Sequence, residues 1–172
     1  HRCAQDVLAK WGGRFPQRAA DLVTLPGIGA STAAAISAFC SGERISILDG
    51  NVRRVLTRLL AFDQDLAQAG PQRALWDLAQ HLVPAEPEGD DMAAYTQGLM
   101  DLGATVCTRT RPACALCPVT DLCEGRRSGD PVRFPVRTRR LVRRFEAWWL
   151  LLLERPAAEG GSEVWLEKRP DR

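Results

Sequence analysis

The sequence predicts a mainly α-helical fold followed by the beginning of an α/β domain, and three observations carry this prediction. Apolar residues recur at three- and four-residue spacing through residue 104, a stretch without any strand pattern. A cysteine-rich loop follows at residues 107–123, and short aromatic and aliphatic runs begin at residue 145. These changes divide the chain into a helical core (1–125), a basic linker (126–144) and the start of a second domain (145–172).

The expected helices follow one another with short connections, and glycines and prolines mark several of their ends. They span residues 2–11, 16–23, 31–40, 52–60, 71–83 and 92–104. In the second domain, residues 148–153 predict one strand and residues 164–166 another, on either side of a glycine turn at residues 160–161. We expect these strands to form the first hairpin of that domain.

Composition and charge narrow the class of protein. Apolar residues make up 45% of the 172 residues, which is enough to bury a core, and no apolar run approaches the length of a membrane-spanning helix. The chain opens without a basic-then-apolar leader, so we expect a cytoplasmic protein with no membrane role. Residues 126–144 hold eight arginines against the single acid Asp130, a segment suited either to a phosphate backbone or to a solvated linker.

Lysine is scarce in this chain. Only Lys10 and Lys168 are lysines among the 23 basic side chains. An enzyme that forms a Schiff base needs an amine, and arginine cannot replace it because the guanidinium group stays protonated. The composition therefore disfavours chemistry that depends on an amine nucleophile.

The strongest chemical signal is a set of four cysteines with the spacing C-x6-C-x2-C-x5-C. They are Cys107, Cys114, Cys117 and Cys123. In a chain without a secretory signal, such a set is more typical of a metal site than of disulfides, and both a four-iron cluster and a tetrahedral zinc take four thiolates. The single C-x2-C pair favours iron–sulfur, because zinc sites usually combine two such pairs. Cys3 and Cys40 fit no pattern and are interpreted as structural.

A second signal is the pentapeptide Leu25-Pro26-Gly27-Ile28-Gly29 between two expected helices. Proline ends the preceding helix, and the glycines allow positive φ and a close approach of the backbone to another surface. Amides at the start of the next helix then form an anion site that holds a phosphate. The alternative is a Pro-Gly turn that only joins two helices.

A third signal is Asp49, which precedes Gly50-Asn51 at the expected start of a helix. Aspartate at this position is typical of an N-cap on a tight turn. If the site faces a sugar, the same carboxylate can stabilise positive charge that develops at the anomeric carbon. The sequence leaves both interpretations open.

In order and spacing, these segments resemble the adenine DNA glycosylases of the helix-hairpin-helix superfamily. The matching segments are residues 25–29, 31–33, 48–52 and 97–103 together with the four cysteines. The resemblance covers residues 1–125 and implies a helix-hairpin-helix DNA glycosylase core with an iron–sulfur cluster loop. From Phe134-Pro135 onward the chain resembles that family's linker and the first strands of its α/β Nudix-like domain, which reads the oxidised guanine opposite the adenine.

The resemblance implies a role for each matched position. Asp49 matches the catalytic aspartate, and Asn51 matches an asparagine that forms hydrogen bonds in the active site. The residues implied in DNA binding are Leu25, Pro26, Gly27, Ile28, Gly29, Ser31, Arg109 and Arg111. The residues implied near the base pocket are Gln97, Met100 and Asp101. The four cysteines match the ligands of one [4Fe-4S] cluster.

The implied function is base excision repair, in which a monomer hydrolyses the N-glycosidic bond of adenine mispaired with 8-oxoguanine or guanine in double-stranded DNA. The implied setting is the bacterial cytoplasm, at the nucleoid. The family's general-acid glutamate has no counterpart after His1, and the chain stops at Arg172 before most of the Nudix-like fold, so we expect the fragment to be inactive alone. One alternative is an endonuclease III-like glycosylase/lyase, which carries a lysine where this chain has Ser31. Another is a DNA-binding module without activity.

Overall fold

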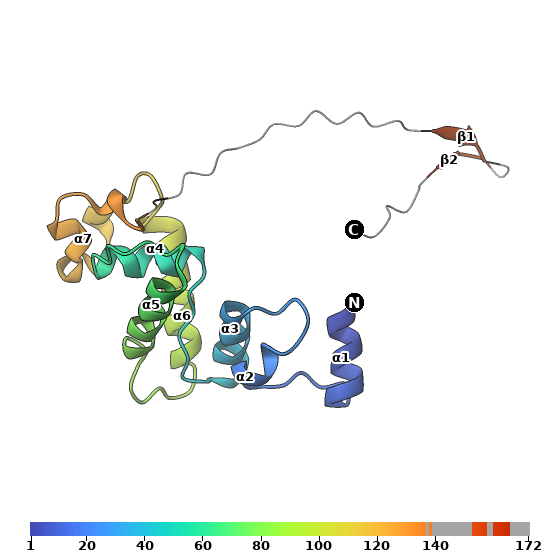
Figure 1. The fold of residues 1–172 in the computed structure, drawn as a ribbon, viewed down its shortest axis with the longest axis horizontal. Helices are drawn as coiled ribbons and strands as arrows, with labels where there is room; N and C mark the ends of the chain where they lie inside the picture. The colour runs from blue at the N-terminus through green and yellow to red at the C-terminus, as the bar shows by residue number, and fades with distance from the viewer. Residues whose placement is uncertain (137, 139–152, 158–159, 166–172) are drawn as a thin grey trace. The chain divides into compact units, whose positions relative to one another are not determined.

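A computed structural model of the chain describes residues 1–136, 138, 153–157 and 160–165. The chain divides into two compact units, His1–Arg139 and Arg140–Arg172. Among the described residues, the first unit contains only helices and connecting segments, and the second contributes a two-stranded sheet (Figure 1). None of the described helices has the length and apolar character needed to cross a membrane.

The six expected helices are all present, and a short seventh follows the cysteine loop. The α-helices are α1 (Arg2–Trp11), α2 (Ala19–Leu22), α3 (Ala30–Ser41), α4 (Gly50–Leu59), α5 (Ala69–His81), α6 (Asp91–Asp101) and α7 (Glu124–Arg127). Helix α2 is shorter than the expected 16–23, because Arg18 has extended backbone (φ −90°, ψ 141°) and the helix starts only after it.

The cysteine loop is built from short helical turns. Helix α6 continues into the π-helical turn η1 (Leu102–Val106), so the expected helix at 92–104 changes its winding near its end. The loop then contains the 3-10 turns η2 (Cys114–Leu116) and η3 (Thr120–Leu122), and η4 (Pro131–Arg133) follows α7. Such turns give the chain the tight curvature that brings cysteines six and seven residues apart into one neighbourhood.

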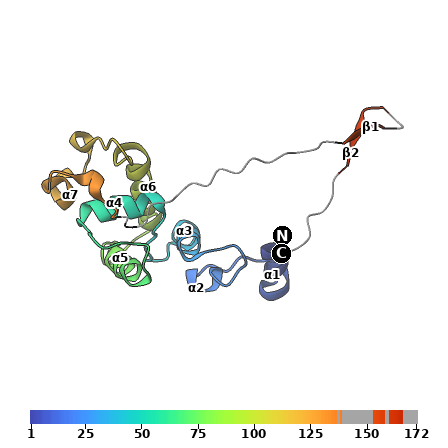
Figure 2. The same ribbon diagram turned by 45° about the horizontal axis from the view of Figure 1, so that its top comes forward.

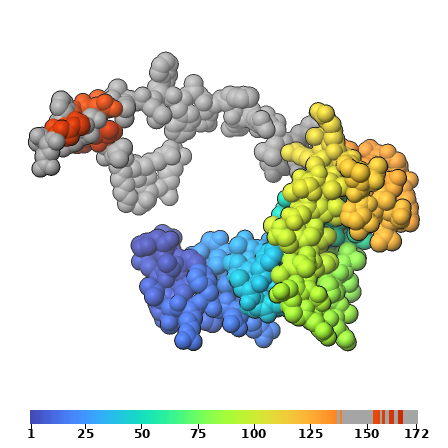
Figure 3. Space-filling model, turned by 180° about the vertical axis from the view of Figure 1, so that it is seen from behind, coloured from blue at the N-terminus to red at the C-terminus, as the bar shows by residue number. Residues whose placement is uncertain are grey.

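The helices of the first unit form a row. Helices α4, α5, α6 and α7 gather at one end, α1 lies at the other, and α2 and α3 lie side by side between them (Figures 1 and 2). Helix α3 packs on both α2 and α6, and α4 packs on α7 and η1. In the space-filling view α6 and the start of the cysteine loop lie between α3 and the orange α7 region (Figure 3).

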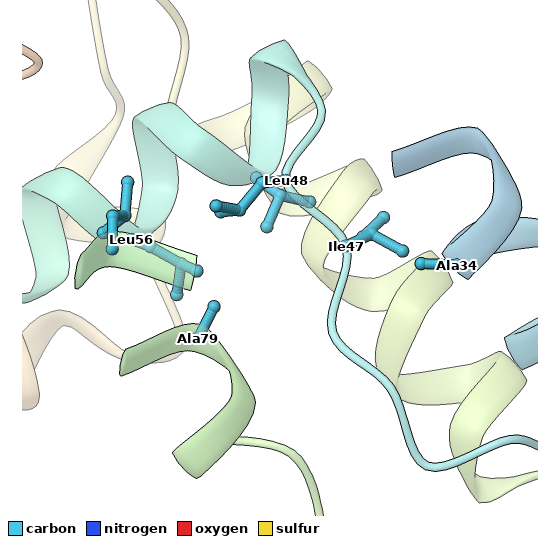
Figure 4. Close-up of a cluster of buried hydrophobic side chains, with 7 residues drawn as sticks. Ala34, Ile47, Leu48, Leu56 and Ala79 are labelled. Atoms are coloured by element: carbon cyan, nitrogen blue, oxygen red, sulfur yellow. The ribbon is translucent and has the colours of Figure 1, made fainter. Parts of the chain in front are cut away.

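The main core cluster joins α3, α4 and α5 around the segment that leads into α4. Its buried members are Ala34, Ile47, Leu48, Val52, Leu56, Leu75 and Ala79 (Figure 4). Leu48 is 1% exposed, and burial of a leucine side chain stabilises a fold by about 2 kcal/mol. Because Leu48 is fixed in the core, the next residue, Asp49, has a fixed position at the surface of that core.

A second cluster of buried residues anchors the turn between α2 and α3. Its members are Val7, Ala19, Leu22, Leu25 and Ala33, from α1, α2, the turn and α3. The buried Leu25 side chain therefore fixes the position of the turn, and contacts at the tip of the turn do not.

The compact helical unit extends beyond the expected core boundary at residue 125. Helix α7 packs on α4, and Phe134 is only 3% exposed. The high arginine content of residues 126–144 predicts a linker, and this composition gives no sign that one aromatic side chain, Phe134, is buried against the helical unit. Residues 137 and 139–144 of the expected linker lie outside the described part of the chain.

The second unit contains the expected hairpin, with its strands at shifted positions. Strands β1 (Glu154–Pro156) and β2 (Ser162–Val164) pair antiparallel, with Glu154 opposite Val164. The second strand therefore starts at residue 162, not at residue 164 as expected, because pairing begins directly beside the glycine turn. Residues 148–152 of the expected first strand lie outside the described residues, and the Nudix-like character of this unit stays a prediction.

Candidate functional site

The turn at residues 25–29 presents exposed backbone at the start of α3. Leu25 is buried, and the Ile28 N–H donates to the Leu25 carbonyl at 3.1 Å. Gly27 has φ +83°, a value that favours glycine, and its α-carbon faces open space. Gly29 is the N-cap residue of α3 and offers no side chain to its first-turn amides, so these amides are available to an anion.

Ser31 and Asp49 lie close together although they belong to different helices. The Leu48 N–H donates to Ser31 Oγ at 3.3 Å, which links the first turn of α3 to the residue before Asp49. Asp49 is partly buried at the N-cap of α4, and its Oδ1 accepts a hydrogen bond from the Val52 N–H at 2.7 Å. The expected N-cap is therefore confirmed, and the capping carboxylate lies beside the helix that the turn begins.

Asn51 is connected to the cysteine loop through Arg54. The Arg54 Nη2 group donates to Asn51 Oδ1 at 2.7 Å and to the Gly103 carbonyl at 2.6 Å. Its Nε donates to the Cys107 carbonyl at 2.7 Å. One guanidinium group thus joins the turn after Asp49 to η1 and the first cysteine.

Gly103 permits this approach of η1 to α4. A Cβ at residue 103 would lie 2.7 Å from the Asn51 Cβ and 3.0 Å from the Asn51 carbonyl oxygen. Any side chain there would push η1 away from α4 and lengthen the hydrogen bonds of Arg54. The glycine in the Leu102-Gly103 step is therefore required by packing.

The four expected metal ligands, Cys107, Cys114, Cys117 and Cys123, line one cavity, and each is partly buried. Burial raises the pKa of the Cys117 thiol, a bond from the Val119 N–H opposes this, and the three neighbouring cysteines raise it further. Among the described residues, no three Cys, His, Asp or Glu side chains form a ready site for one ion.

Arg58 fastens the cysteine loop to α4. Its guanidinium group donates to the carbonyls of Thr108 at 2.7 Å, Arg109 at 2.9 Å and Phe134 at 3.2 Å, and to Cys107 Sγ at 3.3 Å. Arg58 is 2% exposed, so these contacts replace water almost completely. A buried guanidinium group requires such partners, because an unsatisfied donor in the interior is costly.

The residues implied near the base pocket are not joined to Asp49 by any described contact. Gln97 is exposed, and its Nε2 donates to Asp101 Oδ1 at 2.8 Å, four residues along α6. Met100 is partly buried against the main core cluster. Arg109 and Arg111 are both exposed on the cysteine loop, and Arg109 lines a cavity with residues of α4.

The arginines of α4 were missed by the sequence reasoning. Arg54 and Arg58 are four residues apart and share one helix face, which is a pattern usually found on a solvated surface. Several of their partners are backbone carbonyls about 50 positions away, as in the Arg58 to Thr108 bond (50 residues apart), and no local pattern reveals them. The available signal was Gly103 and Gly125, whose lack of a side chain permits close approach to this helix.

The fold matches a solved structure over three quarters of the chain. No family model matches the sequence. The structure of a thermostable thymine-DNA glycosylase superimposes with a TM-score of 0.61 and 29% identity, covering 74% of this chain and 56% of that one. The fold is thus that of the helix-hairpin-helix class of DNA glycosylases, with a Pro-Gly turn before α3 and a carboxylate at the start of α4.

Curated relatives specify the family within this class. The adenine DNA glycosylase of Homo sapiens is 45% identical over 125 residues, covering 72% of this chain and 22% of that protein. That of Rattus norvegicus is 35% identical over 208 aligned positions, covering 98% of this chain and 39% of that protein. The chain belongs to the adenine DNA glycosylase family and spans less than half the length of these relatives.

Proposed function

We propose that this chain belongs to an enzyme that hydrolyses the N-glycosidic bond of adenine in double-stranded DNA. It contributes residues that bind the DNA backbone and a carboxylate that faces the reacting sugar. The observation that carries the proposal is the hydrogen bond from the Leu48 N–H to Ser31 Oγ. This bond joins the residue before Asp49 to the first turn of α3, and it supports a site in which the Asp49 carboxylate acts beside amides that bind a phosphate. Adenine mispaired with guanine or 8-oxoguanine is the substrate that the family resemblance implies, in base excision repair by a cytoplasmic monomer.

The chemistry follows from what these residues can hold. An adenine must leave the base stack before its glycosidic bond is accessible. The amides at the start of α3 hold a backbone phosphate beside the extruded nucleotide, and Asp49 then faces its sugar. As the bond breaks, the sugar becomes oxocarbenium-like, and the carboxylate stabilises it electrostatically or as a nucleophile. The resemblance assigns protonation of the leaving base to a glutamate outside the matched residues.

A hydrolase is favoured over a lyase because no described amine accompanies Asp49. Ser31 stands where endonuclease III-like enzymes carry lysine, and its Oγ accepts a bond from the Leu48 N–H. The Lys10 side chain is 64% exposed and pairs with Asp6 at 2.7 Å on α1. We expect no covalent DNA adduct under borohydride, which captures only an imine. An adduct that forms with the full-length enzyme would support the lyase alternative.

The four cysteines fit a [4Fe-4S] cluster, because four thiols from one loop surround a single cavity beside the cationic Arg58. Bound there, the cluster would supply cross-links that organise the loop, since four thiolates leave no iron position open for the reaction. Anaerobically purified protein should contain iron and sulfide in equal amounts. Stoichiometric zinc without sulfide would contradict the assignment.

Substitution Asp49→Asn in the full-length protein tests the proposed function. Asparagine keeps an oxygen acceptor for the Val52 N–H, so the N-cap survives and only the charge is lost. We expect adenine release to slow by about 10³-fold, while affinity for mispaired duplex stays within about threefold, because the lost interaction forms only in the transition state.

The matched control is Asp63→Asn, which removes the charge of an exposed carboxylate and should leave the rate unchanged. Wild-type adenine release by Asp49→Asn would limit Asp49 to its capping role. If the full-length wild-type protein binds duplex but releases no adenine, the DNA-binding module is the correct interpretation.

A further inference from the structure

The connection from α3 to α4 ends at Asp49. Residues 43–48 form this connection and lie outside any helix or strand, and Figure 4 shows Ile47 and Leu48 on it, among the buried side chains of the main core cluster. Ser46, Ile47 and Leu48 are each at most 4% exposed. A buried peptide group needs a hydrogen-bond partner, and this stretch has no helix or sheet to provide one. Side chains from elsewhere in the fold must therefore hold it.

Gln80 supplies two of the required partners with one side chain. The Ser46 N–H donates to Gln80 Oε1 at 2.9 Å, and Gln80 Nε2 donates to the Arg44 carbonyl at 3.1 Å. In a parallel β-ladder, a carbonyl and the N–H two residues further along are bonded by a single residue of the neighbouring strand. The side-chain amide of Gln80 takes the place of that neighbouring residue.

Gln80 is itself held in place at the end of α5. The residue before it, Ala79, is 1% exposed in the main core cluster. In the opposite direction, Arg44 Nε donates to the Pro84 carbonyl at 2.7 Å, and Arg44 Nη2 donates to the Val83 carbonyl at 3.2 Å. The connection and the end of α5 are therefore bonded to each other in both directions, so the Gln80 amide is a rigid point of attachment.

Gln80 and Ser31 both bond the backbone just before Asp49, but not equally well. The bond from the Ser46 N–H to Gln80 is 2.9 Å long, whereas the bond from the Leu48 N–H to Ser31 Oγ is 3.3 Å long. An N–H···O bond is best near 2.9 Å and weakens beyond about 3.2 Å. Gln80 is therefore the stronger of the two attachments, although it lies further from the site.

We propose that Gln80 is a positioning residue for Asp49. The Val52 N–H orients the Asp49 carboxylate relative to α4, and the attachment of the connection to Gln80 fixes where α4 begins. This inference rests on the proposed function, in which the carboxylate stabilises the reacting sugar. A charge that is displaced by about 1 Å from a developing positive charge can lose about 10²-fold in rate, so a small shift of the connection is enough to matter.

The first experiment measures single-turnover adenine release by the full-length protein with Gln80→Leu, which keeps a side chain of similar size and removes both bonds. We expect release to slow by at least about tenfold, while affinity for mispaired duplex stays within about threefold. The matched control is Gln68→Leu, an exposed glutamine before α5 whose side chain makes no capping bond, and it should release adenine as wild type does. Wild-type release by Gln80→Leu would overturn the proposal.

The second experiment asks whether Gln80 acts through Asp49. The same substitution is made in the Asp49→Asn background, and the slow residual release is followed over hours. Because no charge remains to be positioned, Gln80→Leu should change this residual rate by less than about twofold. A purely structural role of Gln80 lowers the amount of folded enzyme, and so the rate, by the same factor in both backgrounds. An equal slowing in the two backgrounds would therefore contradict the proposal.

Hydrogen exchange tests the attachment without any measurement of activity. In the full-length protein, the Ser46 amide should exchange at least about tenfold faster in Gln80→Leu than in the wild type, since it loses its acceptor. Unchanged exchange would overturn the proposal. If Gln80→Leu does not fold, Gln80→Glu takes its place in the rate measurements, because it keeps an acceptor for Ser46 and loses only the donor to Arg44, and a smaller slowing of about threefold is expected.

The failure of this inference differs from the failure of the proposed function. Wild-type adenine release by Asp49→Asn would refute both, because there would be no charge whose position matters. Slow release by Asp49→Asn together with wild-type release by Gln80→Leu would refute the role of Gln80 alone.

Discussion

The turn at residues 25–29 and the cysteine loop at residues 107–123 both present backbone to a ligand, but they are held in place differently. In the turn, the hydrogen bonds are local, as from the Ile28 N–H to the Leu25 carbonyl and from the Leu25 N–H to the Leu22 carbonyl. In the loop, the fastening bonds come from Arg54 and Arg58, 49 to 53 residues away along the chain. The hydrogen bonds of the turn thus come from neighbouring residues, whereas the loop depends on hydrogen bonds from one face of α4.

Because of this difference, we expect substitutions to affect the turn and the cysteine loop differently. A substitution in the turn changes only the backbone conformation of a few residues, and the core beneath Leu25 persists. Loss of an arginine from α4 leaves several partly buried carbonyls without donors at once, and a fully buried group of this kind costs about 1 to 3 kcal/mol. We therefore expect the largest effects in α4, although α4 lies outside both ligand-binding segments.

The largest effect is expected for Arg58→Ala, which should lower the free energy of unfolding by about 3 to 5 kcal/mol, because four carbonyls and one sulfur lose their buried donor. Denaturant unfolding measures the loss, and iron content should fall with it. Arg111→Ala, an exposed arginine of the same loop, should change stability by less than about 0.5 kcal/mol. Equal stabilities for the two variants would show that the loop does not depend on α4.

A smaller effect is expected for Gly103→Ala, which should cost about 2 kcal/mol because the new methyl group overlaps the backbone and Cβ of Asn51. Gly98→Ala, five residues earlier on the exposed side of α6, meets nothing within 4 Å and should stabilise the protein by about 0.5 to 1 kcal/mol. Thermal unfolding of the pair checks the opposite signs. If both variants are stabilised, η1 does not need its close contact with α4.

The same contrast explains how much of the molecule the sequence predicts. All six expected helices, the Asp49 N-cap and the glycine-rich turn follow from local patterns, since periodicity, capping and positive φ act within a few residues. Three other features do not follow from local patterns, because each depends on contacts with distant segments. They are the docking of Phe134, the burial of Arg58 and the π-helical winding of η1. A buried arginine and a solvated arginine look the same in a sequence.

The candidate site likewise contains features that local patterns predict and features that depend on the folded chain. The approach of Ser31 to Asp49 is consistent with the order of motifs but rests on the core position of Leu48. Arg109 was expected to contact DNA, but the cavity that it lines together with Arg53 was not predicted, because the two residues are 56 positions apart and only the folded loop brings them together. The expected start of the second strand was also wrong, since β2 begins at Ser162, beside the glycine turn, instead of at Val164.

The smallest effect is expected in the turn itself, for Gly27→Ala. Gly27 has φ +83°, a conformation that costs an alanine about 1 to 2 kcal/mol, while nothing near its α-carbon would clash with the methyl group. The more restricted unfolded chain of the variant offsets about 0.4 to 1 kcal/mol of this cost, so a net loss of stability of about 1 kcal/mol is expected.

Gly29→Ala is the matched control, because Gly29 has φ −82° and ψ 167°, which alanine adopts freely, and its α-carbon also faces open space. Its stability should stay within about 0.5 kcal/mol of the wild type, since the unfolded-state gain and the weaker N-cap oppose each other. Chemical unfolding of both variants measures the difference. A loss for Gly29→Ala as large as for Gly27→Ala would mean that crowding at the tip, rather than backbone conformation, decides the stability of the turn.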